Sequence, residues 1–220
     1  MNQKINIQKG NAFITTQYYD KIASTYENTL KETEYKVASW IRKHIQKFES
    51  HQTTILDTGC GNGVLLDWLR EQNVIPAKIV GIDLSSQMLS VALQKGYTLT
   101  LEKDLNFGLG ELDEAYDIVT ALGYLEFLED PKTIIEDIFK ATKVGGYAFL
   151  TFEKKQDQSI TPHPFQTFGT VYRRSYTEEE VKLILETGGF TIVSLESFFA
   201  YRPPSLGTDI YYWAAVLTKY

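Results

Sequence analysis

A short apolar run that ends in a cluster of glycines constrains the fold of this chain more than any other stretch. The run starts at Ile55 and leads into Gly59, Gly61 and Gly63, after which apolar residues recur at helical spacing from Val64. Glycine has no Cβ, so backbone here can approach a ligand closely, and the following helix directs unpaired N–H groups toward it. The stretch predicts a strand, a turn and a helix around a ligand, with an ordinary glycine turn as the alternative.

A second apolar run, Lys78–Asp83, ends in an acid about twenty residues after the glycines. An acid at this place in a doubly wound sheet can accept both hydroxyls of a ribose. Two features argue against NAD or FAD. The sixth position counted from Gly59 is Val64, where the dinucleotide fingerprint needs glycine. In addition, Asp57 would repel a pyrophosphate and favour a cationic ligand.

The glycine motif at 57–63 and the segment 81–89, Gly-Ile-Asp-Leu-Ser-Ser-Gln-Met-Leu, together resemble the class I S-adenosylmethionine-dependent methyltransferases. The resemblance extends from about Tyr18 to the C-terminus. It implies a Rossmann-like α/β fold: a seven-stranded, mostly parallel sheet with an antiparallel last strand and helices on both faces. It also implies S-adenosylmethionine as cofactor, S-adenosylhomocysteine as product, and no metal.

The chain length allows one domain, residues 1–220, with a small cap. The first ten or so residues are polar, and we expect them to be mobile. The expected parts are a helical lid at 1–50, a cofactor-binding core at 51–152, a substrate loop at 153–176, and a closing helix and hairpin at 177–220.

The resemblance assigns cofactor contacts to several places along the chain. An aromatic-Asp-x-x-Ala-x-x-Tyr segment at 19–26 matches a lid whose aromatic residues line the pocket. The pair Asp104–Leu105 matches a corner that reads adenine through one acceptor and one donor. The alternatives are core-facing tyrosines, a core methionine at position 88 and an exposed turn acid at position 104. The implied cofactor residues are Tyr19, Tyr26, Asp57, Gly59, Cys60, Gly61, Asp83, Leu84, Met88, Asp104, Leu105, Ala121 and Leu122.

The segment Ala121–Asp130 follows a predicted strand, at the place where the family holds the transferable methyl group. It lacks the Asn-Pro-Pro-aromatic or Asp-Pro-Pro-aromatic motif of nucleobase-amine methylases. Phe127 stands where many relatives that methylate hydroxyls carry a histidine base, which favours an amine, a carbon or an already ionised oxygen as the acceptor atom. Tyr124 and His163 are the catalytic candidates, and Arg173 can bind an anionic group. The candidate substrate-binding residues are Tyr19, Tyr124, Phe127, His163, Tyr172 and Arg173.

The composition restricts the partners of the chain. A net charge of −6 with no basic stripe argues against DNA or RNA. The sequence has neither a hydrophobic signal segment nor an apolar run long enough for a bilayer, so we expect a cytoplasmic protein without a membrane partner. The single cysteine, Cys60, suits the glycine turn as a small residue. Besides a small-molecule methyltransferase, a protein side-chain methyltransferase and a non-catalytic S-adenosylmethionine-binding homologue remain possible functions.

Overall fold

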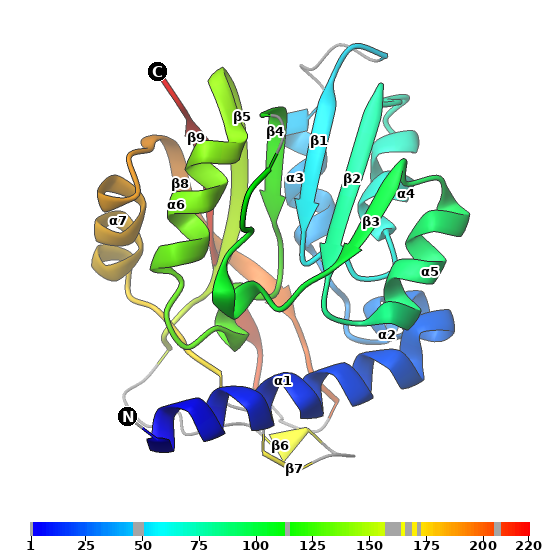
Figure 1. Ribbon diagram of the computed structural model, residues 1–220, viewed down its shortest axis with the longest axis vertical. Coiled ribbons are helices and arrows are strands. Elements are labelled where there is room, and N and C mark those ends of the chain that lie inside the picture. Colours follow the sequence, from blue (N-terminus) through cyan, green and yellow to red (C-terminus); the bar gives the residue numbers. More distant parts are fainter. Residues whose placement is uncertain are drawn as a thin grey trace.

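The computed structural model describes residues 2–45, 51–112, 115–156, 164–165, 169–170, 173–204 and 208–220. Its centre is a seven-stranded sheet with helices on both faces, and the long helix α1 (Asn2–Ile22) lies across one end of the sheet (Figure 1). None of the helices in these residues is both long and apolar enough to cross a membrane.

The sheet has the strand order β3-β2-β1-β4-β5-β9-β8. The pairs from β3 across to β5 are parallel, whereas β9 runs antiparallel to both β5 and β8. The predicted fold, with its antiparallel last strand, is therefore confirmed. The strands are β1 (Thr54–Thr58), β2 (Lys78–Asp83), β3 (Leu99–Glu102), β4 (Tyr116–Ala121), β5 (Thr142–Glu153), β8 (Thr191–Tyr201) and β9 (Ile210–Thr218).

Alternation along the strands supplies one hydrophobic core to each face of the sheet. Ile55 and Ile118 contribute to the core beneath α3, α4 and α5, whereas their successors Leu56 and Val119 contribute to the core beneath α6 and α7. Because successive strand side chains point to opposite faces, both faces of these central strands are apolar and covered. The covering helices are α3 (Val37–Ile45), α4 (Val64–Arg70), α5 (Ser86–Lys95), α6 (Lys132–Ala141) and α7 (Glu178–Thr187).

The chain order creates a crevice between β1 and β4. After β1 the chain builds β2 and β3 on one side and then returns to place β4 on the other. In open α/β sheets, ligands bind outside the carboxyl ends of the strands where the winding direction reverses. Helix α1 and the short helix α2 (Tyr26–Glu32) lie at this end of the sheet (Figure 1).

The structure adds detail to the predicted elements at three places. Helix α1 begins at Asn2, although we expected its first ten residues to be mobile: a polar composition without proline is compatible with a helix. Just before strand β3, the Tyr97 ring is buried against the backbone of Gly63 and Gly81. Within the expected substrate loop, β6 (Pro164–Phe165) and β7 (Gly169–Thr170) form a separate antiparallel pair.

Candidate active site

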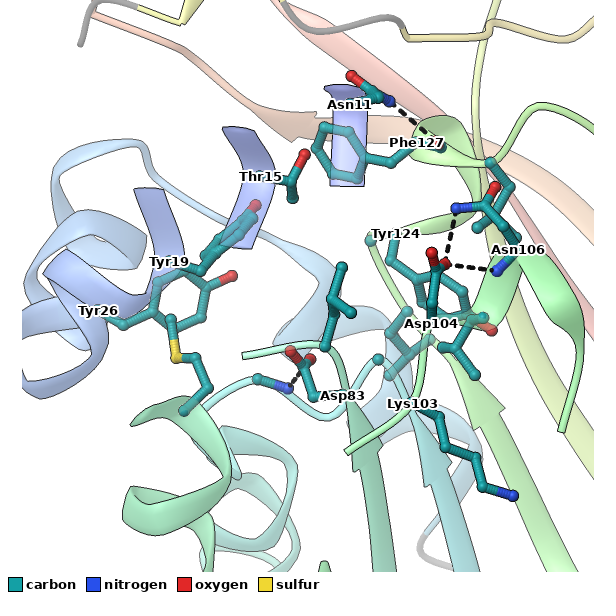
Figure 2. Close-up of a pocket in the computed structure, with 18 residues that line it drawn as sticks. Asn11, Thr15, Tyr19, Tyr26, Asp83, Lys103, Asp104, Asn106, Tyr124 and Phe127 are labelled. Atoms are coloured by element: carbon teal, nitrogen blue, oxygen red, sulfur yellow. Dashed lines mark hydrogen bonds between the residues drawn. The ribbon is translucent and has the colours of Figure 1, made fainter. Parts of the chain in front are cut away.

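A cavity opens at the predicted end of the sheet, under helix α1. Its space, which includes the open mouth, amounts to about 740 Å³, a size within the range of small-molecule sites. Figure 2 shows side chains from α1 on one side and the two acids Asp83 and Asp104 on the other. The described residues that line it are Asn11, Thr15, Tyr19, Tyr26, Gly59, Gly61, Asp83, Leu84, Met88, Lys103, Asp104, Leu105, Asn106, Leu122, Gly123, Tyr124, Phe127 and Leu128.

The glycine turn after β1 forms the floor of this cavity. Gly59 and Gly61 both have positive φ, +66° and +51°. A Cβ on Gly59 would lie only 2.2 Å from the Tyr124 ring, so the ring packs directly on the backbone. A Cβ on Gly61 would meet only the Tyr26 ring, at 3.8 Å. The turn thus leaves open space above Gly61, where a ligand can approach the backbone.

Asp83, at the end of β2, is held in place by the backbone. Its Oδ2 accepts a hydrogen bond from the Gly61 N–H at 2.8 Å, and its Oδ1 accepts one from the Ser85 N–H at 2.9 Å. Burial raises the pKa of the Asp83 carboxyl, while the two backbone donors lower it. A carboxylate has about four acceptor positions, so both oxygens retain capacity for a ligand that donates two hydrogen bonds.

Asp104, after β3, occupies the neighbouring part of the cavity. Its Oδ1 accepts hydrogen bonds from the Asn106 backbone N–H at 3.0 Å and from the Asn106 side chain at 2.8 Å (Figure 2). These contacts hold the carboxylate at the cavity edge, and Leu105 lines the cavity beside it. The arrangement brings the expected acceptor, Asp104, and the expected backbone donor, Leu105, to one corner.

The predicted lid segment is aromatic, and its packing extends to Phe127 on the far wall of the cavity. The ring centres of Tyr19 and Tyr26 are 5.9 Å apart, and those of Tyr19 and Phe127 are 6.5 Å apart, both in edge-on geometry. Asn11 adds a hydrogen bond from its side chain to the Phe127 carbonyl at 3.2 Å. The two tyrosines therefore pack and line the cavity at once, as a docked lid requires.

A polar contact fixes the lid to the start of α5. The Ser85 hydroxyl donates to Asp20 Oδ1 at 2.5 Å, and Ser85 Oγ also accepts from the Met88 N–H as the helix cap. We expect Asp20→Ala to weaken S-adenosylhomocysteine binding about fivefold, because the hydrogen bonds from the Ser85 hydroxyl and the Gln87 N–H to a partly exposed carboxylate are lost while the cap remains. Calorimetric titration measures this, with Lys21→Ala, the exposed neighbour, as control. Equal affinities for the two variants would contradict a role for this contact.

The structure places Asp57 away from the cavity, contrary to prediction. Its side chain is buried and accepts hydrogen bonds from the Tyr97 hydroxyl and the Thr120 hydroxyl, both at 2.6 Å. It therefore fastens β1 to β4 and to the segment before β3. Two further predicted contacts, Cys60 and Ala121, are buried and absent from the described cavity lining, whereas the other ten predicted cofactor residues line it.

The Asp57 carboxyl makes folding stability depend on pH. Burial raises its pKa to about 6, against the lowering effect of the Thr120 and Tyr97 hydrogen bonds, with a further raise from the charge of Asp83. The folded state therefore binds this proton more tightly than the unfolded chain, so the carboxyl destabilises the fold increasingly as pH rises from about 4 to 6. We expect the free energy of unfolding of Asp57→Asn, relative to wild type, to be about 2 kcal/mol higher at pH 7 than at pH 4. Urea unfolding at both pH values measures this, and a pH-independent difference would refute it.

Tyr124 lines the cavity, and its hydroxyl proton is already used in a hydrogen bond within the protein. The Thr58 hydroxyl donates to the Thr120 carbonyl, so the 2.9 Å contact between the two hydroxyls has Tyr124 as donor. Burial also raises the Tyr124 pKa. The phenol is therefore held neutral and is a poor proton acceptor for a substrate. The other catalytic candidate, His163, and the substrate candidate Tyr172 lie outside the described residues.

Arg173 does not lie free in the cavity as predicted. Its side chain is 5% exposed and forms ion pairs with Glu126 and Glu153. The guanidinium carbon lies 5.3 Å from the centre of the Phe127 ring, so the arginine sits behind the cavity wall. Arg173 is thus a buried, ion-paired cation and not the free cation that was predicted to bind an anionic substrate.

Sequence reasoning missed the contribution of α1 beyond Tyr19. Asn11 and Thr15 also line the cavity, and with Tyr19 they recur every four residues. Residues four apart share a helix face, so this spacing was a usable signal. Lys103, Asn106, Gly123 and Leu128 also line the cavity without having been predicted.

Comparison with known proteins identifies the family. Residues 29–195 match a family described as “Methyltransferase domain”, which is more than half of the chain. The chain belongs to the class I S-adenosylmethionine-dependent methyltransferases. Two curated proteins similar to this chain are both named ubiquinone biosynthesis O-methyltransferase. The one from Hydrogenovibrio crunogenus is 36% identical over 115 residues, 49% of this chain and 46% of the relative. The one from Paraburkholderia xenovorans is 32% identical over 141 residues, 61% and 56%. The chain thus spans about half the length of the curated relatives it matches.

Solved structures agree with the fold of this chain. A structure described as a SAM-dependent methyltransferase from Methanosarcina mazei has a TM-score of 0.65 at 19% identity, covering 80% of this chain and 96% of that one. The cyclase SpnF has a TM-score of 0.69 at 17% identity, covering 93% and 94%. Likeness at these identities shows the fold alone. Since one of these structures is described as a methyltransferase and the other as a cyclase, the same fold accompanies more than one named reaction.

Proposed function

We propose that this chain binds S-adenosylmethionine in the cavity under α1 and transfers its methyl group to a small-molecule acceptor. The observation that carries the proposal is the placement of Asp83 and Asp104 on one cavity wall with the open Gly61 backbone beside them. Asp83 would accept hydrogen bonds from both ribose hydroxyls, and Asp104 with the Leu105 backbone would bind the adenine edge. Met88, Leu84 and Leu122 supply apolar walls.

The donor supplies an activated methyl group on a positively charged sulfur. The chain's own task is then to hold a nucleophile in line with that methyl group, about 3 Å away, under a lid that excludes water. The lid tyrosines, Phe127 and the Gly123 backbone bound the space opposite the acids. This enclosed aromatic space favours a small acceptor over a protein side chain, which would need an open groove.

A phenolic hydroxyl is the first acceptor class to test. The curated relatives are named for O-methylation in ubiquinone biosynthesis. Phe127 lies in the cavity wall, so a hydroxyl acceptor must lose its proton to another group. The domain parts at 1–50, 51–152, 153–176 and 177–220 keep their proposed roles of lid, cofactor core, substrate loop and closing elements.

Calorimetric titration with S-adenosylmethionine and S-adenosylhomocysteine tests the cofactor, and transfer of labelled methyl to a panel of phenols, amines and carbon acids tests the reaction. Binding of both ligands with methyl transfer to one acceptor class supports the proposal. Binding without transfer to any acceptor favours the non-catalytic alternative. No binding of either ligand by folded protein would refute the proposal altogether.

A further inference from the structure

Two adjacent threonines of α1 use their hydroxyls differently. Thr16 Oγ1 donates to the Ala12 carbonyl at 2.8 Å, the contact with the residue four positions earlier that threonine commonly makes inside a helix. Thr15 Oγ1 makes no such contact: it is buried and has no hydrogen-bond partner in the described part of the chain. The helix backbone satisfies one hydroxyl and leaves its neighbour unpaired.

The unpaired hydroxyl belongs to the face of α1 that lines the cavity. Thr15 stands between Asn11 and Tyr19 at a spacing of four residues, and all three line the cavity, whereas Thr16 does not. The difference between the two threonines therefore coincides with their position. The residue on the cavity side carries the hydroxyl without a partner, and the residue beside it carries the satisfied one.

Thr15 lies at the end of the cavity that the proposed cofactor contacts leave free. Both of its neighbours on this face contact Phe127: Asn11 donates to the Phe127 carbonyl, and the Tyr19 ring packs edge-on against the Phe127 ring. Figure 2 shows the α1 residues across the cavity from Asp83 and Asp104, the acids that would bind the nucleoside. Thr15 thus faces the space left for the methyl acceptor.

A buried hydroxyl without a partner makes the closed lid less stable. Such a group loses its hydrogen bonds to water and gains none in return, a cost that folded proteins generally avoid. Because Thr15 Oγ1 is shielded from solvent when α1 is packed down, its partner has to be in place before α1 closes. An acceptor that enters the open cavity and meets this hydroxyl would recover the lost hydrogen bond on closure.

The charges around the cavity favour an uncharged partner. Among the described residues that line it, Lys103 carries the positive charge, and its Nζ donates to the Leu109 carbonyl at 2.5 Å. Figure 2 shows that this amine points away from α1. Arg173, behind the wall, is paired with two carboxylates. An anionic group beside Thr15 would therefore be buried without a free cation, which is costly.

We propose that the Thr15 hydroxyl selects the acceptor: it binds an uncharged polar substituent, separate from the atom that receives the methyl group. A hydroxyl can donate or accept, so an amide, a carbonyl or an ether oxygen would satisfy it. No base is hydrogen-bonded to Thr15 to activate it, so its role is recognition. Acceptors without such a substituent leave the hydroxyl unpaired and the lid less firmly closed. This inference rests on the proposed methyl transfer.

Amide hydrogen exchange in α1 tests the cost of the unpaired hydroxyl without any ligand. Thr15→Val keeps the side-chain shape and replaces the hydroxyl with a methyl group. We expect this variant to slow exchange of the α1 amides about fivefold, because the closed lid then buries no unsatisfied oxygen. Thr16→Val is the matched control. Its hydroxyl is already satisfied, so its loss should not slow exchange.

Benzamide and benzoate test the selection, because they share one shape and differ in charge. Each is titrated into the complex with S-adenosylhomocysteine and followed by ligand-observed NMR. Wild type should bind benzamide about tenfold more tightly than benzoate. Thr15→Val should weaken benzamide binding about fivefold while binding S-adenosylhomocysteine at least as tightly as wild type. Thr16→Val should keep the wild-type affinity for both ligands.

Each contrary result has one meaning. Unchanged α1 exchange in Thr15→Val, equal benzamide affinities in the two valine variants, or no benzamide binding by the wild-type complex would overturn the proposal. A loss of S-adenosylhomocysteine affinity in Thr15→Val would make the hydroxyl a cofactor contact and overturn it as well. If S-adenosylhomocysteine does not bind wild type, the proposed function fails instead, and the ligand-free exchange measurement distinguishes the two failures.

Discussion

Replacing Asp83 with alanine should weaken S-adenosylmethionine binding by at least a hundredfold. The substitution removes the acceptor for both ribose hydroxyls, and each hydrogen bond to a charged group contributes about 1.5–3 kcal/mol. It also removes the acceptor of the Gly61 and Ser85 N–H groups, which aligns the glycine turn with β2. Calorimetric titration with S-adenosylmethionine measures the loss.

The matched control for Asp83→Ala is Glu136→Ala, which removes one negative charge from the exposed face of α6. It should bind the cofactor as tightly as wild type. Thermal unfolding without ligand shows whether Asp83→Ala is folded. A folded Asp83→Ala protein with wild-type affinity would mean that the cavity is not the S-adenosylmethionine site, and the proposed function would have to be abandoned.

Asp83 lines the cavity as predicted, whereas Asp57 does not, and the difference has a physical reason. Both acids stand near the carboxyl end of a β-strand, so periodicity treats them alike. Asp83 finds its donors in local backbone, at Gly61 and Ser85. The Asp57 carboxylate instead accepts hydrogen bonds from two side chains, Tyr97 and Thr120, that are 40 and 63 positions away in the sequence. Long-range side-chain pairing of this kind leaves no short-range signal in one sequence.

The same limit explains Arg173 and Glu126. Arg173, one of two adjacent arginines in an irregular segment, was predicted to bind an anionic group, but its partners Glu126 and Glu153 come from different elements. Glu126 stands between Leu125 and Phe127 in the sequence, and no local pattern there predicts its ion pair with Arg173. In contrast, the fold and the turn at Gly59 and Gly61 depend on local patterns of apolar residues and glycines, and those were predicted.

Substitution of Gly59 by alanine should lower the melting temperature by about 10 °C. Two costs add: alanine at a positive φ costs about 1–2 kcal/mol, and the new Cβ would overlap the Tyr124 ring, which costs about 1–3 kcal/mol more. In a domain of this size, 1 kcal/mol corresponds to about 2–4 °C. Calorimetric unfolding measures the shift.

Gly145→Ala carries only the first cost, so its comparison with Gly59→Ala isolates the second. Gly145 also has a positive φ, +77°, but nothing lies within 4 Å of a Cβ built there. This control should lower the melting temperature by about 4 °C through backbone strain alone. Because the overlap at Gly59 can be relieved only by moving Tyr124, Gly59→Ala should also weaken S-adenosylhomocysteine binding, whereas Gly145→Ala should not. Equal melting temperatures and equal affinities for the two variants would show that the Tyr124 ring does not depend on the bare backbone at Gly59.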